Sequence, residues 1–430
     1  MSLDFIGELR WRGMIQDIMP GTEDALVKGP IAGYIGFDPT APSLTVGNLV
    51  AIMMLVHFQR SGHKPFVLMG GATGMVGDPS GKSQERNQLS METIETNLSH
   101  QKEQFLKFLD FNEGPSKAEL VNNIDWFAEI KLLDFLRDIG KHLTLNYMMA
   151  KDSVKSRMDS GISFTEFSYQ LLQGYDFYFL NKNRQIILQM GGSDQWGNIT
   201  AGTELIRRMG GKEAFAITTP LLTKADGTKF GKSSEGNIWL DPQMTSPYKF
   251  YQFWMNSSDE DLPKFIRYFS LLSRQEIEEL EARHEKSPHE RLLQKELARE
   301  LVERVHGIEA YSKALKASEL LFGGGNVDFL QNLDEIEIQQ FFEGVPHFFI
   351  SESKIKEGIN ILDLLATYTT VFSSKGEARK MIEGGGVSLN KVKLDLVSLL
   401  IETQHLLASR YLLIQKGKKN YYLIEIKFDS

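Results

Sequence analysis

The chain has 430 residues, 42% of them hydrophobic, and a formal net charge of −8 at pH 7. A chain of this length and composition can bury a large core and form two or three domains. It has no cysteine, which excludes disulfides and thiolate metal sites and is typical of a reducing compartment. No apolar stretch approaches the roughly 20 residues of a membrane helix, and the first residues lack the apolar segment of a signal peptide. We therefore expect a cytoplasmic protein with no membrane segment.

The first regular pattern predicts a strand, a helix and a second strand. The apolar run IAGYIGF (31–37) is followed by the helical pattern VGNLVAIMMLVHFQRSG (46–62) and by KPFVLMGG (64–71). Strands joined through a helix are parallel, with a right-handed crossover. Further strand-length runs at 185–190 and 214–222 alternate with helical patterns at 92–111 and 198–209. This alternation predicts an α/β fold with a Rossmann-like, doubly wound parallel sheet, which binds ligands at the carboxyl ends of its strands.

Two glycine pairs, Gly70-Gly71 and Gly191-Gly192, lie at the ends of predicted strands. Glycine at such a place lets the backbone approach a ligand closely, and two pairs suggest one shared crevice. Tight turns alone would explain either pair equally well.

The strand pattern stops after about residue 240. The stretches 246–284 and 288–322 predict helices, and the run GGGN at 323–326 with the mixed sequence to about 355 is typical of a linker or small insertion. Residues 361–430 hold ten lysines and arginines against seven aspartates and glutamates, so the tail is basic in an acidic chain. An excess of this size is also within the ordinary variation of a solvated surface.

A polar turn with Asp38, Thr40, Ser43 and Thr45 separates the first strand from its helix. A helix N-terminus offers unpaired N–H groups and partial positive charge, so phosphate is the first ligand to expect there. The chain has no G-x-G-x-x-G motif, and GDPSGKS (77–83) is one residue too short for a P-loop. A nucleotide site at this turn would be of another kind.

The segment SFTEFSYQLLQGYDFYFL (163–180) predicts an apolar helix with three polar residues on one face. Tyr169, Gln173 and Asp176 have the spacing i, i+4 and i+7. Buried polar groups need partners, and these three could hold an ammonium group and a hydroxyl, as in an amino acid with a polar tip. Internal hydrogen bonding is an equally simple alternative.

The segment TKADGTKFGKSSEG (223–236) predicts a loop with three lysines directly after a strand. Lys224, Lys229 and Lys232 could close over a polyphosphate as mobile charges. A solvated surface loop is the alternative, since lysine and glycine are common in loops.

Read together, these segments resemble a known family. KFGKS (229–233) resembles the K-M-S-K-S loop of class I aminoacyl-tRNA synthetases, and TVGN (45–48) stands where that class has H-I-G-H. Nearly the whole chain is similar to bacterial tyrosyl-tRNA synthetases, through GFDPTAPSL, GGATGMVGDPSGKSQER, NYMMAKDSV, GISFTEFSYQLLQGYDF and GGSDQWGNITAG. The tail SSKGEARKMIEGGGVSLN (373–390) resembles the S4 RNA-binding domain that ends those enzymes.

The resemblance implies four segments and a homodimer. We expect a Rossmann-like catalytic domain with an inserted helical dimerisation segment at 1–225, and the lysine loop with an α-helical domain at 226–325. A linker or insertion at 326–355 and a small α+β S4-like tRNA-binding domain at 356–430 would follow.

The reaction that the resemblance implies has two steps. The carboxylate of L-tyrosine attacks the α-phosphorus of ATP, and the tyrosyl group then passes to the terminal adenosine of tRNA-Tyr. Neither step needs a nucleophile on the enzyme, so catalysis is positioning and stabilisation of phosphate charge. Mg²⁺ would arrive with ATP, and no resident metal site is expected.

The resemblance also assigns residues to roles. The phenol of the substrate would meet Tyr34 and Asp176, and an ionised Asp176 demands a donor that phenylalanine lacks. The substrate ammonium would be held by Asp78, Tyr169 and Gln173, with Gln195 nearby and Asn123 in support. The adenylate would be lined by Gly36, Asp38, Gly47, Gly192 and Asp194. The groups expected to act on the phosphates are Thr40, Thr45, Asn48, Lys82, Arg86, Lys229 and Lys232. The RNA contacts would be Lys375, Arg379, Lys380, Lys391 and Lys393.

Two alternatives remain open at this point. A tryptophan-activating relative is disfavoured, because an indole N–H does not need both Tyr34 and Asp176. A synthetase-like RNA-binding protein without activity is conceivable, because Thr45 and Asn48 replace the usual two histidines.

Overall fold

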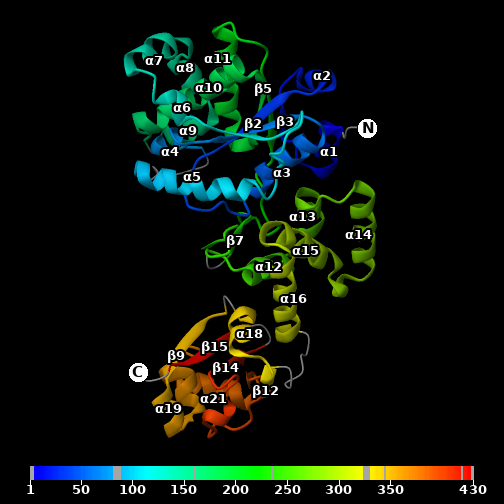
Figure 1. The fold of residues 1–430 in the computed structure, drawn as a ribbon, viewed down its shortest axis with the longest axis vertical. Helices are drawn as coiled ribbons and strands as arrows, with labels where there is room; N and C mark the ends of the chain where they lie inside the picture. Colours follow the sequence, from blue (N-terminus) through cyan, green and yellow to red (C-terminus); the bar gives the residue numbers. More distant parts are fainter. Residues whose placement is uncertain are drawn as a thin grey trace. The chain divides into compact units, whose positions relative to one another are not determined.

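The computed structural model describes residues 4–80, 89–158, 161–233, 236–322, 330–342, 345–417 and 420–427. By its internal contacts the chain divides into two compact units. The first unit comprises Met1–Met244 and Phe253–Val305, and the second comprises Thr245–Gln252 and His306–Ser430. Figure 1 gives the order of the elements along the chain.

The first unit contains the large sheet and most of the helices. Its elements up to the middle of the chain are α1 (Phe5–Arg12), β1 (Asp17–Ile18), α2 (Thr22–Val27), β2 (Ala32–Phe37), α3 (Leu49–Arg60), β3 (Lys64–Met69), α4 (Thr73–Val76), α5 (Met91–Phe105), β4 (Glu119–Asn122), α6 (Ile124–Phe127), α7 (Leu132–Asp138), α8 (Leu145–Met149), α9 (Asp152–Met158) and α10 (Phe164–Arg184). There follow β5 (Ile186–Gly192), α11 (Trp196–Arg208), β6 (Phe215–Thr219), β7 (Lys232–Ser233), β8 (Gly236–Asn237), α13 (Leu262–Phe269), α14 (Arg274–Lys286) and α15 (Leu292–His306). The helix α12 (Pro247–Met255) begins in the second unit and ends in the first.

Among the described residues, six strands form the sheet of the first unit, in the order β1-β6-β5-β2-β3-β4. The neighbours from β6 to β4 are parallel, and the short edge strand β1 pairs antiparallel with β6. The chain runs from β2 outward to β3 and β4 on one side, and from β5 to β6 on the other. The topological switch point therefore lies between β2 and β5, which confirms the predicted doubly wound α/β sheet.

Helices cover both faces of this sheet. A Cβ on Gly33 of β2 would meet Phe58 of α3 at 3.0 Å. The next residue, Tyr34, packs edge-on against Phe177 of α10, with ring centroids 5.5 Å apart. Because successive residues of a strand point to opposite faces, α3 and α10 lie on opposite sides.

Two element boundaries differ from the sequence pattern for local reasons. The helix predicted from residue 46 begins at Leu49, because Asn48 N and Leu49 N donate to Thr45 O and Val46 O and close a turn there. The strand predicted to residue 222 ends at Thr219, since Pro220 has no N–H to donate to a ladder.

The second unit is built on a five-stranded sheet in the order β12-β11-β14-β15-β9. Its elements are α16 (Ile308–Phe322), α18 (Glu335–Phe341), β9 (His347–Ser351), α19 (Glu352–Glu357), β10 (Ile359–Asn360), α20 (Ile361–Asp363), α21 (Lys375–Glu383), β11 (Val387–Leu389), β12 (Val392–Lys393), β13 (Leu400–Ile401), β14 (Tyr411–Lys416) and β15 (Asn420–Lys427). Apolar residues of α19, α20, α21 and of the strands share one buried cluster.

The interpretation of 326–355 as a linker is wrong for the described part of that stretch. Ile338 and Phe342 are buried in a second cluster with Tyr411 and Leu423 of the sheet. The strand β9 pairs in parallel with β15. These apolar residues complete the core of the C-terminal unit, so a boundary at 356 would cut its sheet.

The predicted α-helical domain at 226–325 also does not form a compact unit of its own. Residues up to Met244 and from Phe253 to Val305 group with the first unit, and the remainder with the second. The buried Arg12 of α1 shows why: its guanidinium donates to Arg267 O at 2.6 Å and to Ser270 O at 2.8 Å. Hydrogen bonds of this kind join the helices to the α/β part of the first unit.

Candidate functional site

A cavity of about 140 Å³ lies at the switch point of the large sheet. Its lining comes from the carboxyl ends of β2 and β5, from Gly70 and from one face of α10. Parallel sheets bind their ligands at the carboxyl ends of their strands. The predicted residues that line it are Tyr34, Gly36, Asp38, Asn48, Tyr169, Gln173, Asp176, Gly192 and Gln195. Gly70 and Gly191 both line it as well, which confirms the single crevice predicted from the two glycine pairs.

Asp176 is buried at the base of this cavity and receives two hydrogen bonds. Asn123 Nδ2 donates to Asp176 Oδ2 at 3.0 Å, and Trp126 Nε1 donates to Oδ1 at 2.9 Å. Burial raises the pKa of Asp176 to about 8, although both hydrogen bonds oppose that shift. The resemblance predicts Asn123 as a supporting residue, whereas Trp126 carries no sequence signal that distinguishes it from a core tryptophan.

Tyr34 and Gln173 present polar atoms that the described residues do not satisfy. Within that part of the chain, the Tyr34 hydroxyl and Gln173 Oε1 are buried and have no hydrogen-bond partner. Burial raises the pKa of the Tyr34 phenol well above its usual value, with the nearby Asp176 adding to the shift. A buried hydroxyl beside a carboxylate is a suitable pair to receive one more hydroxyl group.

Asp38, at the end of β2, is held by two hydroxyl groups. Thr73 Oγ1 donates to Asp38 Oδ1 at 2.7 Å, and Tyr169 OH donates to Oδ2 at 2.8 Å. Burial and the charge of Asp38 raise the pKa of Tyr169, so its hydroxyl stays protonated and remains a donor. Thr73 also lines the cavity and is not among the predicted residues.

Asp78 lies just outside the cavity lining in a network of amides. Gln195 Nε2 donates to Asp78 Oδ2 at 2.6 Å, and Asn198 Nδ2 is 3.4 Å from Oδ1. Burial is the main cause that raises the pKa of the neighbouring Asp194, and the charge of Asp78 adds to it. Several carboxyl groups therefore surround this end of the cavity, and such a site attracts a cation.

At the N-terminus of α3, the Thr45 hydroxyl bonds to Asn48, whereas the resemblance implies that Thr45 acts on the phosphates. Asn48 Oδ1 accepts from Thr45 N at 2.9 Å and from Thr45 Oγ1 at 2.8 Å. Because a backbone N–H can only donate, these contacts assign the amide oxygen and leave Asn48 Nδ2 as a donor. Thr45 thus uses its hydroxyl hydrogen on Asn48, and of the two only Asn48 lines the cavity.

The lysine loop is anchored directly against this helix N-terminus. A Cβ on Gly231 would be 3.0 Å from Gly47 N, and Val46 N donates to Ile238 O at 3.0 Å. Phe230 is buried, whereas Lys229 and Lys232 on either side of it are exposed. The structure therefore brings the segments KFGKS and TVGN together and leaves both lysine side chains exposed.

The remaining residues predicted to contact the phosphates or the adenylate lie near the cavity or outside the described part of the chain. Thr40 is exposed in the turn after β2, and its N–H donates to Asp38 O at 2.9 Å. Gly47 and Asp194 are adjacent to lining residues without being part of the lining. Lys82 and Arg86 lie outside the described residues.

The basic residues of the tail that are predicted to contact RNA differ in exposure and in pairing. Arg379 and Lys380 are exposed on α21, and Lys393 is exposed on β12. Lys375 forms an ion pair with Asp363. Lys391 Nζ is 2.7 Å from the Tyr421 hydroxyl, and burial lowers the pKa of Lys391 to about 8, so its ammonium group is less available to RNA than the exposed cations of Arg379 and Lys380.

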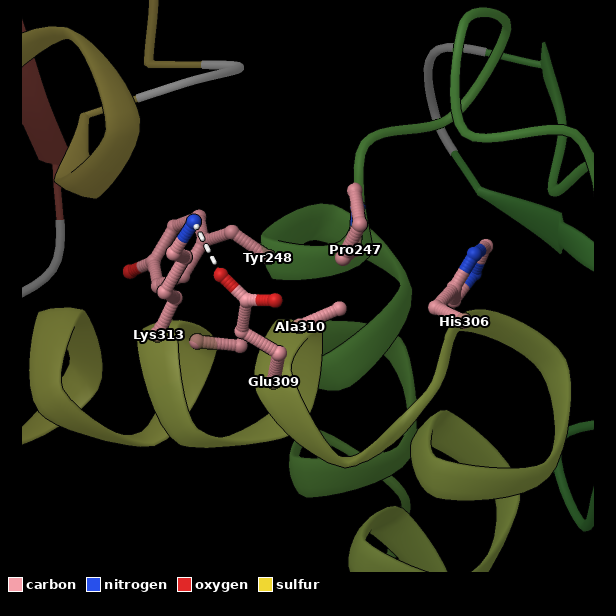
Figure 2. A pocket seen from close by; sticks show the side chains of 7 residues that line it. Pro247, Tyr248, His306, Glu309, Ala310 and Lys313 are labelled. Carbon is pink, nitrogen blue, oxygen red and sulfur yellow. Dashed lines mark ion pairs between the residues drawn. The ribbon is translucent and has the colours of Figure 1, made fainter.

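A larger cavity of about 300 Å³ lies within the second unit, between α12 and α16. Glu309 and Lys313 are among its lining residues and form an ion pair at 3.1 Å, drawn as a dashed line in Figure 2. Its charged side chains thus satisfy each other, and none of the predicted site residues lines it. The smaller cavity at the switch point is therefore the candidate site.

The described residues contain neither a helix that could span a membrane nor a cluster of metal-binding side chains. None of their helices is long and apolar enough to cross a membrane. No group of three or more histidine and acidic side chains in the same ranges could hold a metal ion.

Comparisons with known proteins agree over nearly the whole chain. The family described as "tRNA synthetases class I (W and Y)" matches residues 27–323, and "Tyrosine--tRNA ligase SYY-like C-terminal domain" matches residues 337–424. The tyrosine–tRNA ligase of Cytophaga hutchinsonii is 63% identical over 98% of this chain and 99% of its own. That of Bacteroides fragilis is 57% identical over 99% of this chain and 100% of its own.

A solved structure of the same family matches about three quarters of the chain. A C-terminally truncated mitochondrial tyrosyl-tRNA synthetase of Aspergillus nidulans superposes with a TM-score of 0.67. It is 31% identical and covers 74% of this chain and 94% of its own. The chain belongs to the tyrosine–tRNA ligase family of class I tRNA synthetases.

Proposed function

We propose that the chain joins L-tyrosine to tRNA-Tyr, and that the cavity at the switch point is its active site. In the first step an oxygen of the tyrosine carboxylate bonds to the α-phosphorus of ATP, and pyrophosphate leaves. In the second, a ribose hydroxyl of the terminal adenosine bonds to the acyl carbon, and AMP leaves. The observation that carries this proposal is the buried pair of Asp176 and Tyr34 at the base of the cavity.

Selection of the phenol rests on this pair. Asn123 and Trp126 orient Asp176, and the Tyr34 hydroxyl lies buried without a partner in the described residues. A phenol can donate to the carboxylate and accept from Tyr34, whereas phenylalanine would leave both unpaired. The tyrosine enzyme itself is the standard example of this discrimination, with a ratio of about 10⁵.

The other end of the cavity suits the ammonium and carboxylate of the amino acid. Asp78, Tyr169 and Gln173 hold the ammonium, and Gln195 reaches the same point through its 2.6 Å bond to Asp78. The cluster of carboxyl groups there favours a cation over a neutral ligand.

ATP occupies the mouth of the site. Gly36, Asp38, Gly47, Gly192 and Asp194 line the adenylate, and the α3 N-terminus faces the phosphates. The phosphate charge is stabilised by Thr40, Lys82, Arg86, Lys229 and Lys232, with Asn48 as a further donor. Mg²⁺ enters bound to ATP, since it prefers phosphate oxygens and water as ligands.

The C-terminal unit serves as the tRNA-binding part, as an S4-like domain. Arg379, Lys380 and Lys393 are exposed there and can contact RNA phosphates, and Lys375 can do so if it leaves Asp363. Lys391 is the weakest member of this set, because its ammonium group lies over the Tyr421 ring at 4.5 Å.

The assembly we propose is a homodimer in the cytoplasm. The helices α7, α8 and α10 pack together through Phe135, Met148 and Leu171. The same helices expose large apolar side chains, with Leu133 77% and Phe164 79% accessible. Exposed apolar side chains on adjacent helices are typical of an interface with another chain.

Tyrosine-dependent exchange between ATP and pyrophosphate tests this function. We expect exchange with tyrosine and almost none with tryptophan or phenylalanine. Exchange with tryptophan would indicate the tryptophan-activating alternative. Binding of tRNA without exchange under saturating Mg-ATP and any amino acid would indicate an RNA-binding protein without activity.

A further inference from the structure

The buried amide of Asn123 has a determined orientation. Its Oδ1 accepts from Ala72 N at 2.7 Å, and a backbone N–H can only donate. Asn123 Nδ2 is therefore a donor, and it lies 3.0 Å from both Thr73 Oγ1 and Asp176 Oδ2. Its two hydrogens can serve one of these acceptors each.

The same argument determines the direction of the next bond. Because Thr73 Oγ1 accepts from Asn123, its own hydrogen is available for Asp38 Oδ1 at 2.7 Å. The chain of donors runs from Asn123 through Thr73 to Asp38, while the second hydrogen of Asn123 serves Asp176. One amide is thus connected to carboxylates that belong to two different parts of the cavity.

The backbone leaves room for this connection at Gly70. A Cβ on Gly70 would be 2.1 Å from Asp38 Oδ1 and 2.6 Å from Thr73 Oγ1. Both atoms belong to the Thr73–Asp38 hydrogen bond, so any larger residue would displace it. Gly70 therefore serves this contact, in addition to its place in the cavity wall.

We propose that Thr73 is a positioning residue, whose hydroxyl transmits the orientation of Asn123 to Asp38. The inference rests on the proposed function, in which Asp176 selects the phenol and Asp38 lines the adenylate. Thr73 then aligns the amino acid with the nucleotide, since a single buried amide orients the residues that hold both. Thr73 is buried, with 3% of its surface accessible.

Crystal structures of three variants test the positioning directly. In Thr73→Val, which keeps the shape and removes the hydroxyl, we expect Asp38 Oδ1 to leave its position. In Thr73→Ser, which keeps the hydroxyl, Asp38 should stay. Gly70→Ala should displace Asp38 as Thr73→Val does. An Asp38 carboxylate that stays in place in Thr73→Val overturns the inference, whatever the activity of the protein.

Exchange kinetics provide the second readout. Thr73→Val should lower kcat for tyrosine-dependent exchange roughly ten- to hundredfold, as expected for a lost hydrogen bond to a charged group, and Thr73→Ser should restore it to within about threefold. The effect of Asn123→Ala on the KM for ATP should disappear in the Thr73→Val background. Additive effects of the two substitutions would contradict the connection through Thr73. If the unmodified protein shows no exchange, the proposed function fails, and the position of Asp38 in the crystals still decides the role of Thr73.

Discussion

The backbone of Gly231 lies directly against that of Gly47, so that a Cβ on Gly231 would be 3.0 Å from Gly47 N. Gly231 also has a φ of +83°, a conformation that other residues rarely adopt. This contact joins the lysine loop to the N-terminus of α3, where we place the phosphates of ATP. The two exposed lysines of the loop are therefore carried on a backbone that is anchored at the site.

The first prediction concerns this contact. Gly231→Ala adds backbone strain and a clash, so it should lower kcat for adenylate formation at least tenfold while the Kd for tyrosine changes less than about twofold. Pre-steady-state kinetics and equilibrium tyrosine binding measure the two quantities. Gly227→Ala is the matched control: Gly227 has a φ of +78° in the same loop, but a Cβ there would have no atom within 4 Å. Equal losses in both variants would assign the effect to strain alone.

A second prediction follows from the bond between Thr45 and Asn48. Thr45→Val should raise the activation barrier by about 1 kcal/mol, the value of one neutral hydrogen bond, and Thr45→Ser should restore the rate. Asn48→Asp keeps the acceptor for Thr45 and removes the Nδ2 donor, so it should lower kcat more than Thr45→Val does. If Thr45→Val still lowers kcat in an Asn48→Ala background, Thr45 acts on the phosphates itself rather than through Asn48.

A third prediction concerns Asp176 and selectivity. Asp176→Asn replaces a carboxylate with an amide that can also donate, so the demand for a phenolic proton relaxes. The ratio of kcat/KM for tyrosine to that for phenylalanine should fall at least tenfold, measured by pyrophosphate exchange. An unchanged ratio would remove Asp176 from the phenol site.

The same residue makes the stability and the affinity depend on pH. The folded-state pKa of about 8 lies above the unfolded value of about 4, so the folded protein keeps a proton that the unfolded chain has lost. The free energy of unfolding should therefore fall between about pH 4 and pH 8, by up to about 1.4 kcal/mol per pH unit. Over the upper part of this window tyrosine should bind more tightly as pH rises, because the carboxylate form accepts the phenol. Denaturant titrations and tyrosine binding should both lose this component in Asp176→Asn.

A fourth prediction addresses the dimer. Leu133→Glu places a charge on an apolar side chain that is 77% accessible on α7, and it should raise the dimer dissociation constant at least tenfold by analytical ultracentrifugation. Val27→Glu is the control, since Val27 is 86% accessible on α2, which Figure 1 shows on the opposite side of the first unit from α7 and α8. An equal effect of the two substitutions would place the interface elsewhere.

The last prediction separates activation from charging. A chain ending at residue 322 keeps the whole of the first unit and should retain tyrosine-dependent exchange. Aminoacylation of tRNA-Tyr should fall at least tenfold, because the basic surface of the second unit is lost, and its salt dependence should become weaker. A cut at 355 is a poorer test, since it leaves β9 without its partner β15. Normal charging by the shorter chain would exclude the second unit as a tRNA-binding part.

The sequence by itself determined the class of fold and most of the cavity. Helix and strand periods differ, so the strand–helix–strand pattern from residue 31 predicts a parallel sheet without tertiary information. The spacing of Tyr169, Gln173 and Asp176 places them on one helix face, and that face does line the cavity. Both predictions depend on the periods of individual helices and strands, which short stretches of sequence specify.

Only the tertiary structure decided which side chains complete the site. Trp126 and Thr73 come from other elements than Asp176 and Asp38, and their sequence surroundings are those of ordinary core residues. The sequence is equally compatible with a Thr45 that faces a phosphate, and only the turn at the start of α3 places its hydroxyl next to Asn48. Residues 345–351 have the mixed pattern of a linker, because their apolar side chains show no clear period, yet they add a strand to the sheet of the second unit. Hydrogen bonds and burial between distant segments depend on how the elements pack, and that packing has no local pattern in the sequence.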